Sequence, residues 1–346
     1  ITGNRSTASA GSGGGTQALI GGADMVKSTV VIPNYNGIRY IEDCLDSLYA
    51  GTQTQFEVIM VDNASTDGSR ELVQEKFPQV KLICNETNTG FSEAVNQGIL
   101  ASTTPYVILL NNDTRADKAF IHELEKAIEK DTRIFSASAK LISLHDMTKL
   151  DDAGDYYCAL GWAFARGKGK APALYEKEDR IFAACGGAAI YRREYFERVG
   201  LFDVNHFAYL EDIDVGYRAQ LCGYQNRFAP AAIVYHAGSA TSGSRYNAFK
   251  TKLAARNSIY LVYKNMPLLQ ILINLPFLLA GCLVKWLFFI RKGMGREYAA
   301  GVAEGFKLSA SAKGRSQKVH FAPSRLMAYI RIQCALWCNI IRMIRK

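Results

Sequence analysis

The sequence lacks the cysteine spacing of a zinc site or of a disulfide-stapled scaffold. Its eight cysteines are spread from Cys44 to Cys338, and no C-x-x-C pair occurs among them. This spacing fits reduced thiols in a cytoplasmic compartment, where most cysteines are small core residues. The 346 residues are 49% hydrophobic and 21% charged, a globular composition that excludes intrinsic disorder and collagen-like repeats.

Glycine-rich nucleotide-binding motifs are also missing. No G-x-G-x-x-G follows the first predicted strand, which argues against a dinucleotide dehydrogenase, and no G-x-x-x-x-G-K-[ST] marks a P-loop. A phosphate site in this chain would therefore have to be built from other residue types.

Acidic residues are scarce in the C-terminal part of the chain. From Lys285 to Lys346 there are 13 lysines and arginines but only two glutamates, so this segment carries a net +11. The whole chain carries +9, which leaves −2 for residues 1–284. A basic tail of this kind suits either nucleic acid or an anionic membrane surface.

Apolar residues next to the basic ones favour the membrane over nucleic acid. The 18 residues 267–284 contain no charged side chain, and Trp286 and further aromatic and cationic residues follow directly. Such a run is at the lower limit for crossing a bilayer, with interface residues at its end. Gln270, Asn274 and Pro276 weaken the prediction of a straight span, and a buried core helix is the alternative.

Residues 325–346 repeat apolar side chains at helical spacing, with arginines among them. This pattern predicts an amphipathic helix that lies on a membrane. The alternative is a terminal helix packed on the body of the protein or on a second subunit.

Residues 28–113 alternate between strand and helix patterns. Strands are predicted within 28–36, 56–65, 80–86 and 106–113, and helices within 41–51, 69–78 and 91–102. This order predicts an α/β fold, in which a mostly parallel, Rossmann-like sheet is covered by helices on both faces. Ligands of such sheets bind beyond the carboxyl ends of the strands.

Polar residues gather at three of these strand ends. They are Pro33 to Gly37, Asp62 to Gly68, and Asn111 to Asp113. Each cluster alone would also serve as a helix N-cap or an Asx-turn. Three clusters at one edge of a sheet favour a binding site. Their carboxylate and amide oxygens suit a hard divalent cation, Mg²⁺ or Mn²⁺, which would bridge phosphates.

These segments resemble the nucleotide-sugar half of glycosyltransferase family 2. The matching motifs are VVIPNYNG (30–37), VDNASTDGS (61–69), NTGFS (88–92), LNND (110–113), GGAA (186–189), GLFD (200–203), FAYLEDID (207–214) and VYH (234–236). Within this family, the sequence is most similar to bacterial rhamnosyltransferase-like enzymes that build polysaccharides. The resemblance implies a GT-A fold and inversion at the anomeric carbon.

The resemblance also implies a donor site. Asp62 would pair with the base of the nucleotide sugar, and Pro33 to Asn36 would line the base and ribose pocket. Gly187 would let the backbone approach the sugar closely. The implied donor-binding residues are Pro33, Asn34, Tyr35, Asn36, Asp62, Asn63, Ser65, Asn88, Gly90, Asn96, Asn111, Asn112 and Gly187.

Two further residues are implied as metal ligands. Asn111-Asn112-Asp113 occupies the place of the family's D-x-D motif, so Asp113 would be the main ligand of Mg²⁺ or Mn²⁺. His236 stands where a third ligand occurs in related enzymes, although a lone histidine at a strand end is usually structural. The loss of the first carboxylate, at Asn111, is also what a non-catalytic sugar-binding scaffold would show.

The acidic run from Glu211 to Asp214 is implied to carry the catalysis. Inversion needs a base within hydrogen-bond reach of the acceptor hydroxyl. By resemblance Asp212 is this base, and Glu211 and Asp214 place the acceptor or support the loop. The same residues begin a predicted helix, where acids favour the helix dipole.

Residues 137–183 are less periodic and are predicted to form a flexible loop on the acceptor side. Within this loop Arg166, Lys168 and Lys170 would meet a lipid phosphate or remain solvated. Trp162 would stack on an acceptor sugar or pack in the interior.

The sequence thus predicts three parts: a flexible leader without a signal-peptide core (1–25), a GT-A catalytic domain (26–258) and a membrane-associating region (259–346). The expected function is inverting transfer of a sugar, rhamnose from dTDP-rhamnose as first choice, to a glycan or lipid-linked glycan of a cell-surface polysaccharide. The alternatives are a UDP-hexose or UDP-galactofuranose donor, or the scaffold. The expected location is the cytoplasmic face of the bacterial membrane, peripheral or monotopic. No nucleic acid partner is expected, and the oligomeric state is left open.

Overall fold

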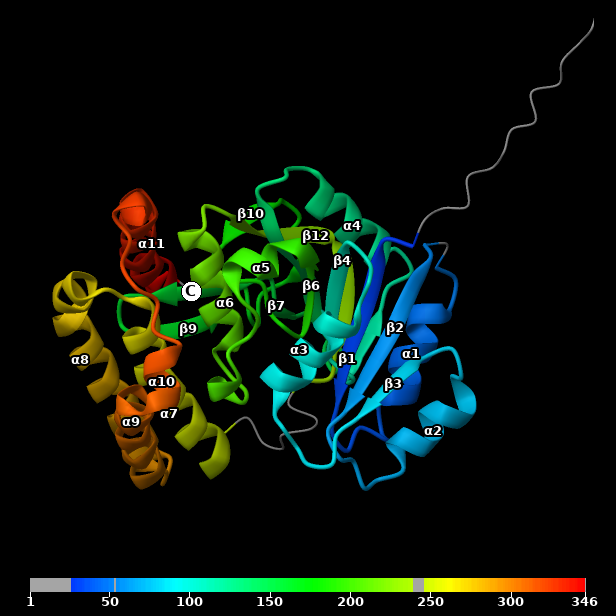
Figure 1. Ribbon diagram of the computed structural model, residues 1–346, viewed down its shortest axis with the longest axis horizontal. Coiled ribbons are helices and arrows are strands. Elements are labelled where there is room, and N and C mark those ends of the chain that lie inside the picture. Colours follow the sequence, from blue (N-terminus) through cyan, green and yellow to red (C-terminus); the bar gives the residue numbers. More distant parts are fainter. Residues whose placement is uncertain (1–25, 53, 239–245, 346) are drawn as a thin grey trace, which may run out of the picture.

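The computed structural model describes residues 26–52, 54–238 and 246–345 (Figure 1). The leader predicted for residues 1–25 lies outside the described residues. The strands are β1 (Ser28–Asn34), β2 (Phe56–Asp62), β3 (Lys81–Cys84), β4 (Tyr106–Leu110), β5 (Thr114–Ala116), β6 (Ile134–Ser143), β7 (Leu150–Asp152), β8 (Asp155–Cys158), β9 (Trp162–Ala165), β10 (Asp179–Ile181), β11 (Ala188–Arg192) and β12 (Gln225–His236). The α-helices are α1 (Ile41–Tyr49), α2 (Ser69–Lys76), α3 (Phe91–Ala101), α4 (Phe120–Glu129), α5 (Phe196–Val199), α6 (Glu211–Leu221), α7 (Ala248–Asn265), α8 (Leu268–Arg291), α9 (Gly295–Ala310), α10 (Ala312–Ser316) and α11 (Leu326–Ile344).

A mixed sheet runs through the middle of the molecule. Its strands follow the order β10-β12-β6-β11-β4-β1-β2-β3, with β5 and β7 attached to β12 and β6. β1 pairs in parallel with β2 and β4, and β12 pairs in parallel with β6, whereas β11 runs antiparallel between β4 and β6. The predicted, mostly parallel α/β sheet is therefore confirmed.

Helices cover both faces of the sheet. Successive side chains of a strand point to opposite sides, so a strand of continuous apolar residues presents an apolar surface on each face. Val30 and Ile32 of β1 belong to a core with Leu45 of α1. Val31 belongs to the core on the other face, against α3. There Gly98 lies so close to the strand that an added Cβ would stand 2.2 Å from the Val31 side chain.

Residues 137–183 do not form the flexible loop that the sequence predicted. They contain most of β6 and all of β7 to β10, and β6 is buried between β11 and β12. The sequence of β6, IFSASAKLIS, hides the strand because its buried positions include Ser136 and Ser138. Ser136 donates a hydrogen bond of 2.8 Å to Asn226 of β12. Distant segments of the chain thus bury a strand that lacks an apolar run.

The C-terminal helices pack against one another and against the sheet domain (Figure 1). α11 contributes Tyr329, Ile332 and Leu336 to the core that lies on the α3 face of the sheet. One face of α11 is therefore packed on the body of the protein, which was the alternative to a helix lying on a membrane. The predicted boundary between residues 258 and 259 falls inside α7, which has buried residues on both sides of that point. α7, which contributes Leu261, and α11 thus share one core with the sheet.

Buried charges connect α6 to α7. Lys264 of α7 lies 2.8 Å from Asp203 and 2.9 Å from Asp214 of α6, and Arg218 lies 2.7 Å from Asp214. Burial alone would raise the pKa of Asp214, but Arg218 and Lys264 hold it well below its ordinary value. This ion cluster fixes α6, which begins with Glu211, against α7.

We expect Lys264→Met to lower the free energy of unfolding by about 3–5 kcal/mol, because it leaves two buried carboxylates without their shared cation. Chemical denaturation measures this loss. The matched control is Lys252→Met in the same helix, where the ion pair with Glu304 is half-exposed and worth at most about 1 kcal/mol. Equal losses in the two variants would contradict this account of the ion cluster.

Candidate functional site

The polar clusters predicted at the strand ends meet at one edge of the sheet. Asn34, at the end of β1, is in register with Asp62 at the end of β2. Residues 111–113 follow β4, which is parallel to β1. β11 begins at the same edge because it is antiparallel to β4, and the backbone of Asn111 donates a hydrogen bond of 2.9 Å to Gly187 just before β11.

Buried amides and a carboxylate form the centre of this edge. The Asn34 side chain donates hydrogen bonds to Asp62 (2.9 Å) and to Ser69 (2.9 Å), and it accepts one from Asn112 (2.7 Å). Asp62 also accepts from the backbone N–H of Ser65 (3.0 Å). The structure thus brings together four predicted donor-binding residues, and Pro33 precedes them in β1. The sequence analysis did not identify Ser69 as a site residue, because a serine in this position is typical of an ordinary helix start.

Two loops above this centre hold each other in place. Asn36, at φ 51°, accepts a hydrogen bond from the backbone of Thr66 and donates its own backbone N–H to Ser65. Asp67 accepts from the backbone of Ile38 (2.8 Å), a contact that the sequence did not indicate. Tyr35 remains 39% exposed beside this pair of loops. The loops form the rim of the candidate site.

Asn63, Asn88 and Gly90 form a second group at the ends of β2 and β3. Asn63 donates a hydrogen bond of 3.1 Å to the carbonyl of Gly90, whose N–H binds the Asn88 side chain at 3.0 Å. Gly90 has φ +86°, and an added Cβ would stand 2.5 Å from the Phe207 ring. The absence of a side chain at Gly90 therefore leaves room for the Phe207 ring.

Asn96 stands apart from the other predicted donor-binding residues. It is buried in α3, where its side chain donates to the carbonyl of Phe202 (2.8 Å) and accepts from the N–H of the same residue (3.0 Å). Both halves of the amide are used in fixing the segment before α6. Asn96 thus has a structural role, and its contact with the donor stays a prediction.

Asp113 and His236 come together from β-segments far apart in sequence. His236, the last residue of β12, places Nε2 3.3 Å from Asp113 and Nδ1 2.7 Å from Asp151. Burial lowers the pKa of His236, but hydrogen bonds to Asp113 and Asp151 outweigh burial and raise it to about 9. A carboxylate that orients the far nitrogen of a histidine is the usual outer support of a metal ligand. The residues present therefore fit a divalent cation, and the sequence missed Asp151.

A strained loop leads into the acidic residues of α6. Phe207, Tyr209 and Leu210 all have positive φ, between 62° and 70°, which is costly for residues with a side chain. Asn257 of α7 holds this loop by donating to the carbonyls of His206, Ala208 and Tyr209 at 2.8–2.9 Å. No motif in the sequence marks Asn257 for this task.

Glu211 and Asp212 open α6 at the end of that loop. Glu211 is buried, and its Oε2 has no hydrogen-bond partner among the described residues. Burial and the neighbouring Asp212 raise the pKa of Glu211 well above its ordinary value. Asp212 accepts a hydrogen bond of 2.7 Å from the backbone of Ile213. Burial also raises the pKa of Asp212, against the effect of that bond.

Residues predicted on the acceptor side are already engaged within the protein. The Arg166 guanidinium lies over the rings of Tyr175 and Phe228, and Lys168 lies 2.5 Å from Asp151. Trp162 donates a hydrogen bond of 3.1 Å to the backbone of Gly281 in α8; by contrast, Lys170 is exposed. Of the predicted contacts, the geometry therefore leaves Lys170 the most accessible to a lipid phosphate.

Comparison with known proteins relates this chain to sugar-transferring enzymes. Residues 29–200 match the family model described as glycosyl transferase family 2. The chain is 27% identical over 239 residues to the N-acetylglucosaminyl-diphospho-decaprenol L-rhamnosyltransferase of Mycobacterium tuberculosis H37Rv, a match that covers 62% of this chain and 77% of that protein. It is 32% identical over 129 residues to TuaG of Bacillus subtilis 168, a putative teichuronic acid biosynthesis glycosyltransferase, across 36% of this chain and 50% of that protein.

Solved structures share the fold. GalNAc-T7, crystallised with UDP, GalNAc and Mn²⁺, superposes with a TM-score of 0.58 at 18% identity, over 69% of this chain and 48% of that chain. The mannosyltransferase PcManGT from Pyrobaculum calidifontis, in complex with GDP-Man and Mn²⁺, superposes with a TM-score of 0.52 at 17% identity, over 89% and 87%. The GT-A-like architecture expected from the sequence is thereby confirmed.

Proposed function

Because the chain belongs to glycosyltransferase family 2, a family of nucleotide-sugar glycosyltransferases, we propose that it transfers a sugar with inversion to a hydroxyl of a growing, lipid-linked cell-surface polysaccharide. We take rhamnose from dTDP-rhamnose as the first-choice donor, since the mycobacterial relative is named an L-rhamnosyltransferase. The observation that carries the proposal is a chain of contacts at one edge of the sheet. Asn34 bonds to Asp62 and to Asn112, Asn111 bonds to Gly187, and the N–H of the adjacent Gly186 bonds to Asp212. UDP-hexoses and UDP-galactofuranose are the alternative donors.

The donor would bind over the amide cluster at the ends of β1 and β2. Asp62 keeps its carboxylate beside Asn34 and the N–H of Ser65, so its position is fixed before a ligand arrives. A carboxylate in this place can accept a hydrogen bond from the N–H of a pyrimidine base. Exposed Tyr35 offers a ring to the same ligand.

Asp113 and His236 would hold Mg²⁺ or Mn²⁺, with Asp151 orienting the histidine. When bound, the cation would offset the negative charge that develops on the leaving diphosphate. Asn111 supplies no charge, so Asp113 is the main anionic ligand of this proposed site.

Asp212 would act as the base. The strained loop before α6, held by Asn257, leads directly into the first turn of the helix, which carries Asp212. There it would accept the proton of the acceptor hydroxyl as that oxygen attacks the anomeric carbon on the face opposite the diphosphate. Burial and then Asp212 raise the pKa of Glu211 well above its ordinary value, and in its protonated form Glu211 would donate a hydrogen bond to a sugar oxygen.

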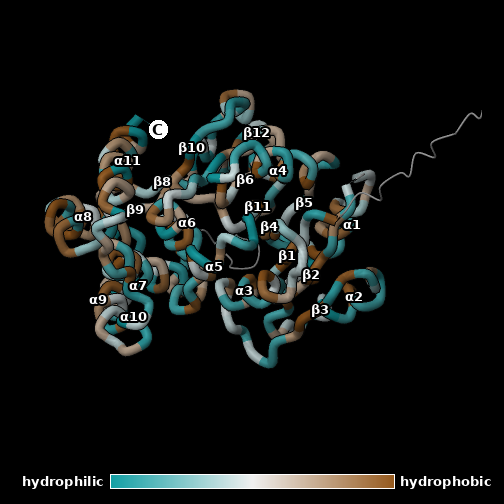
Figure 2. The backbone as a smooth tube through the Cα atoms, turned by 45° about the horizontal axis from the view of Figure 1, so that its top comes forward, coloured by the Kyte–Doolittle hydropathy of each residue, from teal (hydrophilic) through white to brown (hydrophobic). Residues whose placement is uncertain are grey.

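The surface of α8 supports a location on the membrane. Its buried positions are Gln270, Asn274 and Gly281, and 11% of its most apolar window is buried. Asn274 exchanges two hydrogen bonds of 2.8 Å with Gln333 of α11. The polar residues of α8 thus face the protein and its leucines face outward, the reverse of a helix on a water-soluble core. Figure 2 shows the hydrophobic colour along α8 at the edge of the molecule.

The residues that weakened the prediction of a straight span all lie within one continuous helix. The helix runs without a break through Pro276, so the proline does not end it. Gln270 accepts a hydrogen bond of 2.6 Å from Tyr217 of α6, which places Gln270 against the protein.

One helix in the described part of the chain, α8, is long and apolar enough to cross a membrane. We propose that α8 lies in the cytoplasmic leaflet of a bacterial membrane, with the basic tail at the anionic surface.

We expect the combined substitutions Leu272→Gln, Leu279→Gln and Leu283→Gln to weaken binding to vesicles that contain anionic lipid. These leucines are 55%, 62% and 52% exposed, and each one buried in lipid contributes about 1.5–3 kcal/mol, or roughly tenfold or more in partitioning. Co-sedimentation measures this. The control combines Leu100→Gln and Leu174→Gln, which are 70% and 72% exposed away from α8. Unchanged partitioning, with a smaller particle mass in solution, would point to a second copy of the chain as the occupant of this face.

A binding screen tests the proposed donor. Full-length protein with Mn²⁺ is titrated with dTDP-rhamnose, UDP-glucose, UDP-galactofuranose and the free nucleotides. We expect dTDP-rhamnose to bind more tightly than dTDP or the UDP-sugars. Preference for a UDP-sugar would replace rhamnose as the donor while keeping the class of reaction, and the absence of binding to any nucleotide sugar would refute the function.

A further inference from the structure

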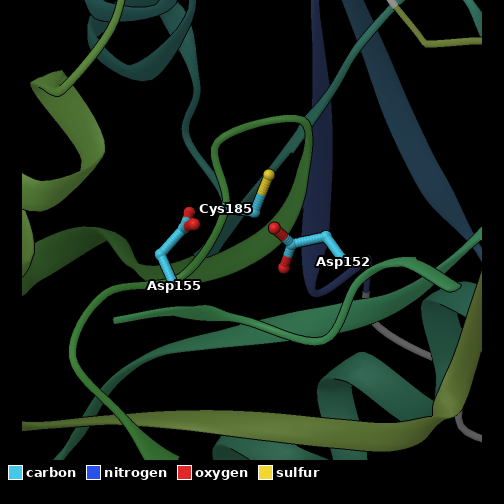
Figure 3. A group of neighbouring side chains, drawn as sticks. All are labelled: Asp152, Asp155 and Cys185. Carbon is cyan, nitrogen blue, oxygen red and sulfur yellow. The ribbon is translucent and has the colours of Figure 1, made fainter. Parts of the chain in front are cut away.

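An acidic cluster next to the proposed base has no role in the function described above. Asp152 at the end of β7, Asp155 at the start of β8, and Cys185 place carboxylate and thiol atoms within 4.8 Å of one another. Figure 3 shows these three side chains as close neighbours. Asp155 also hydrogen bonds to the Asp212 carboxyl. The cluster therefore extends from β7 to the first turn of α6.

The backbone of Asp155 is fixed on both sides. Its N–H donates to the carbonyl of Ala183 (3.0 Å), and its carbonyl accepts from Phe182 (2.9 Å). Across the β8–β9 hairpin it pairs with Ala165. Since the direction of a strand side chain follows its backbone, these bonds hold the Asp155 carboxyl toward Asp212.

Negative groups dominate the surroundings of Asp155. The titratable groups that act on it or on its neighbours in the cluster are Asp151 and Asp152 from β7, Cys185, Tyr191 from β11, and Glu211, Asp212 and Asp214 from α6. Among the described residues, Lys168 is the cation that acts on Asp155, and its Nζ already lies 2.5 Å from Asp151. Carboxyls packed this closely do not all ionise. The cluster therefore retains protons near neutral pH.

The distribution of hydrogen-bond donors decides which carboxyl keeps the charge. Asp212 accepts from the backbone N–H groups of Ile213 and Gly186, and donors to a carboxylate favour its charged form. Burial, and then the charges of Asp152 and Asp212, raise the pKa of Asp155 well above its ordinary value. The negative charge thus belongs on Asp212 and the proton on Asp155.

We propose that Asp155 is a positioning residue that keeps its proton and donates it in a hydrogen bond to Asp212, so that the Asp212 carboxylate stays ionised and oriented toward the acceptor hydroxyl. This proposal rests on the role of Asp212 as the base. The Asp155 proton is not transferred in the reaction: the acceptor proton moves to Asp212, and Asp155 retains its own. The bond between the two carboxyls weakens once Asp212 has been neutralised.

The pH dependence of kcat tests this arrangement, because its acid limb reports the ionisation of the base. Asp155→Ala removes a donor to Asp212, which raises the pKa of Asp212 and moves the acid limb to higher pH by about one unit or more. Asp155→Asn keeps an N–H donor, so its acid limb should stay close to that of the wild type. The KM for the donor should change in neither variant. Asp43→Asn, at an exposed position of α1, is the matched control.

The opposite shift would overturn the proposal. If Asp155 were ionised, both substitutions would remove a negative charge from the neighbourhood of Asp212, and the acid limb would move to lower pH. Infrared spectroscopy gives a reading that does not depend on turnover. Glu211, whose pKa is also raised, contributes to the carbonyl-stretch band of protonated carboxyls. In difference spectra at pH 8, Asp155→Asn should therefore lose one component of this band relative to the wild type, whereas Asp212→Asn should keep it.

Different results would refute the role of Asp212 as the base and the positioning role of Asp155. If Asp212→Asn keeps near-normal turnover, the base assignment fails whatever the infrared band shows. If that variant is inactive but Asp155→Asn leaves the infrared band unchanged, Asp212 remains the base and the proposal for Asp155 is refuted.

Discussion

Replacing Asp212 with asparagine is expected to lower turnover by a factor of about 10² or more, the scale usual for the loss of a general base. The amide keeps the size of the carboxyl and can still accept the hydrogen bond from Ile213, but it has no charge with which to take the acceptor proton. Donor affinity should hardly change, because the proposed base and ribose contacts lie at Asp62 and its neighbours. Steady-state kinetics together with donor titration separate the two effects.

Two controls make this result specific. Asp214→Asn alters the next acid of the motif, which is bound to Arg218 and Lys264 inside the protein, so we expect it to lower stability. Unfolding curves show whether lost activity in either variant reflects loss of the folded protein. Turnover close to the wild-type value in folded Asp212→Asn would assign the base to another group.

Removal of Asp113 is expected to have the second large effect. Asp113→Ala should weaken Mn²⁺-dependent donor binding by about 10–100-fold, and His236→Ala should weaken it less, because the carboxylate supplies the charge. Calorimetric titration of the nucleotide sugar with and without Mn²⁺ measures both. Asp46→Ala, at an exposed position of α1, is the matched acid-to-alanine control.

A metal requirement also predicts the effect of chelation. Excess EDTA should abolish transfer, and added Mn²⁺ or Mg²⁺ should restore it. Equal activity in EDTA and in Mn²⁺ would show that Asp113 and His236 serve another purpose. In that case the 2.7 Å contact between His236 and Asp151 would be a structural link between β12 and β7.

The sequence predicted the half of the fold in which buried strands have continuous apolar runs. In β1, β2 and β4 the runs end at polar clusters, and parallel pairing brings those ends together, as the register of Asn34 with Asp62 shows. β6 escaped prediction because tertiary neighbours, and not its own residues, bury Ser136 and Ser138. The pattern of apolar and polar residues along a segment does not reveal whether strands will flank it on both sides.

The candidate site was predictable where a motif gives the residue type together with its place after a strand. Asp151, Asp152 and Asp155 escaped because they stand at strands that could not be recognised. Asn257 escaped because its task, holding the carbonyls of the loop before α6, depends on the packing of a helix far along the chain. The absence of charged residues from 267–284 marked an apolar segment in α8, but not which side its few polar residues face.

The central claim is that this protein transfers a sugar from a nucleotide diphosphate, and one measurement tests it most directly. Full-length protein on vesicles with anionic lipid and Mn²⁺ is given dTDP-rhamnose and a lipid-linked glycan acceptor, and the product is followed by mass and by the NMR signal of its anomeric carbon. The account predicts that wild-type protein adds one sugar with inverted configuration, and that Asp212→Asn adds almost none. Product with retained configuration, or equal product from the two proteins, would contradict it.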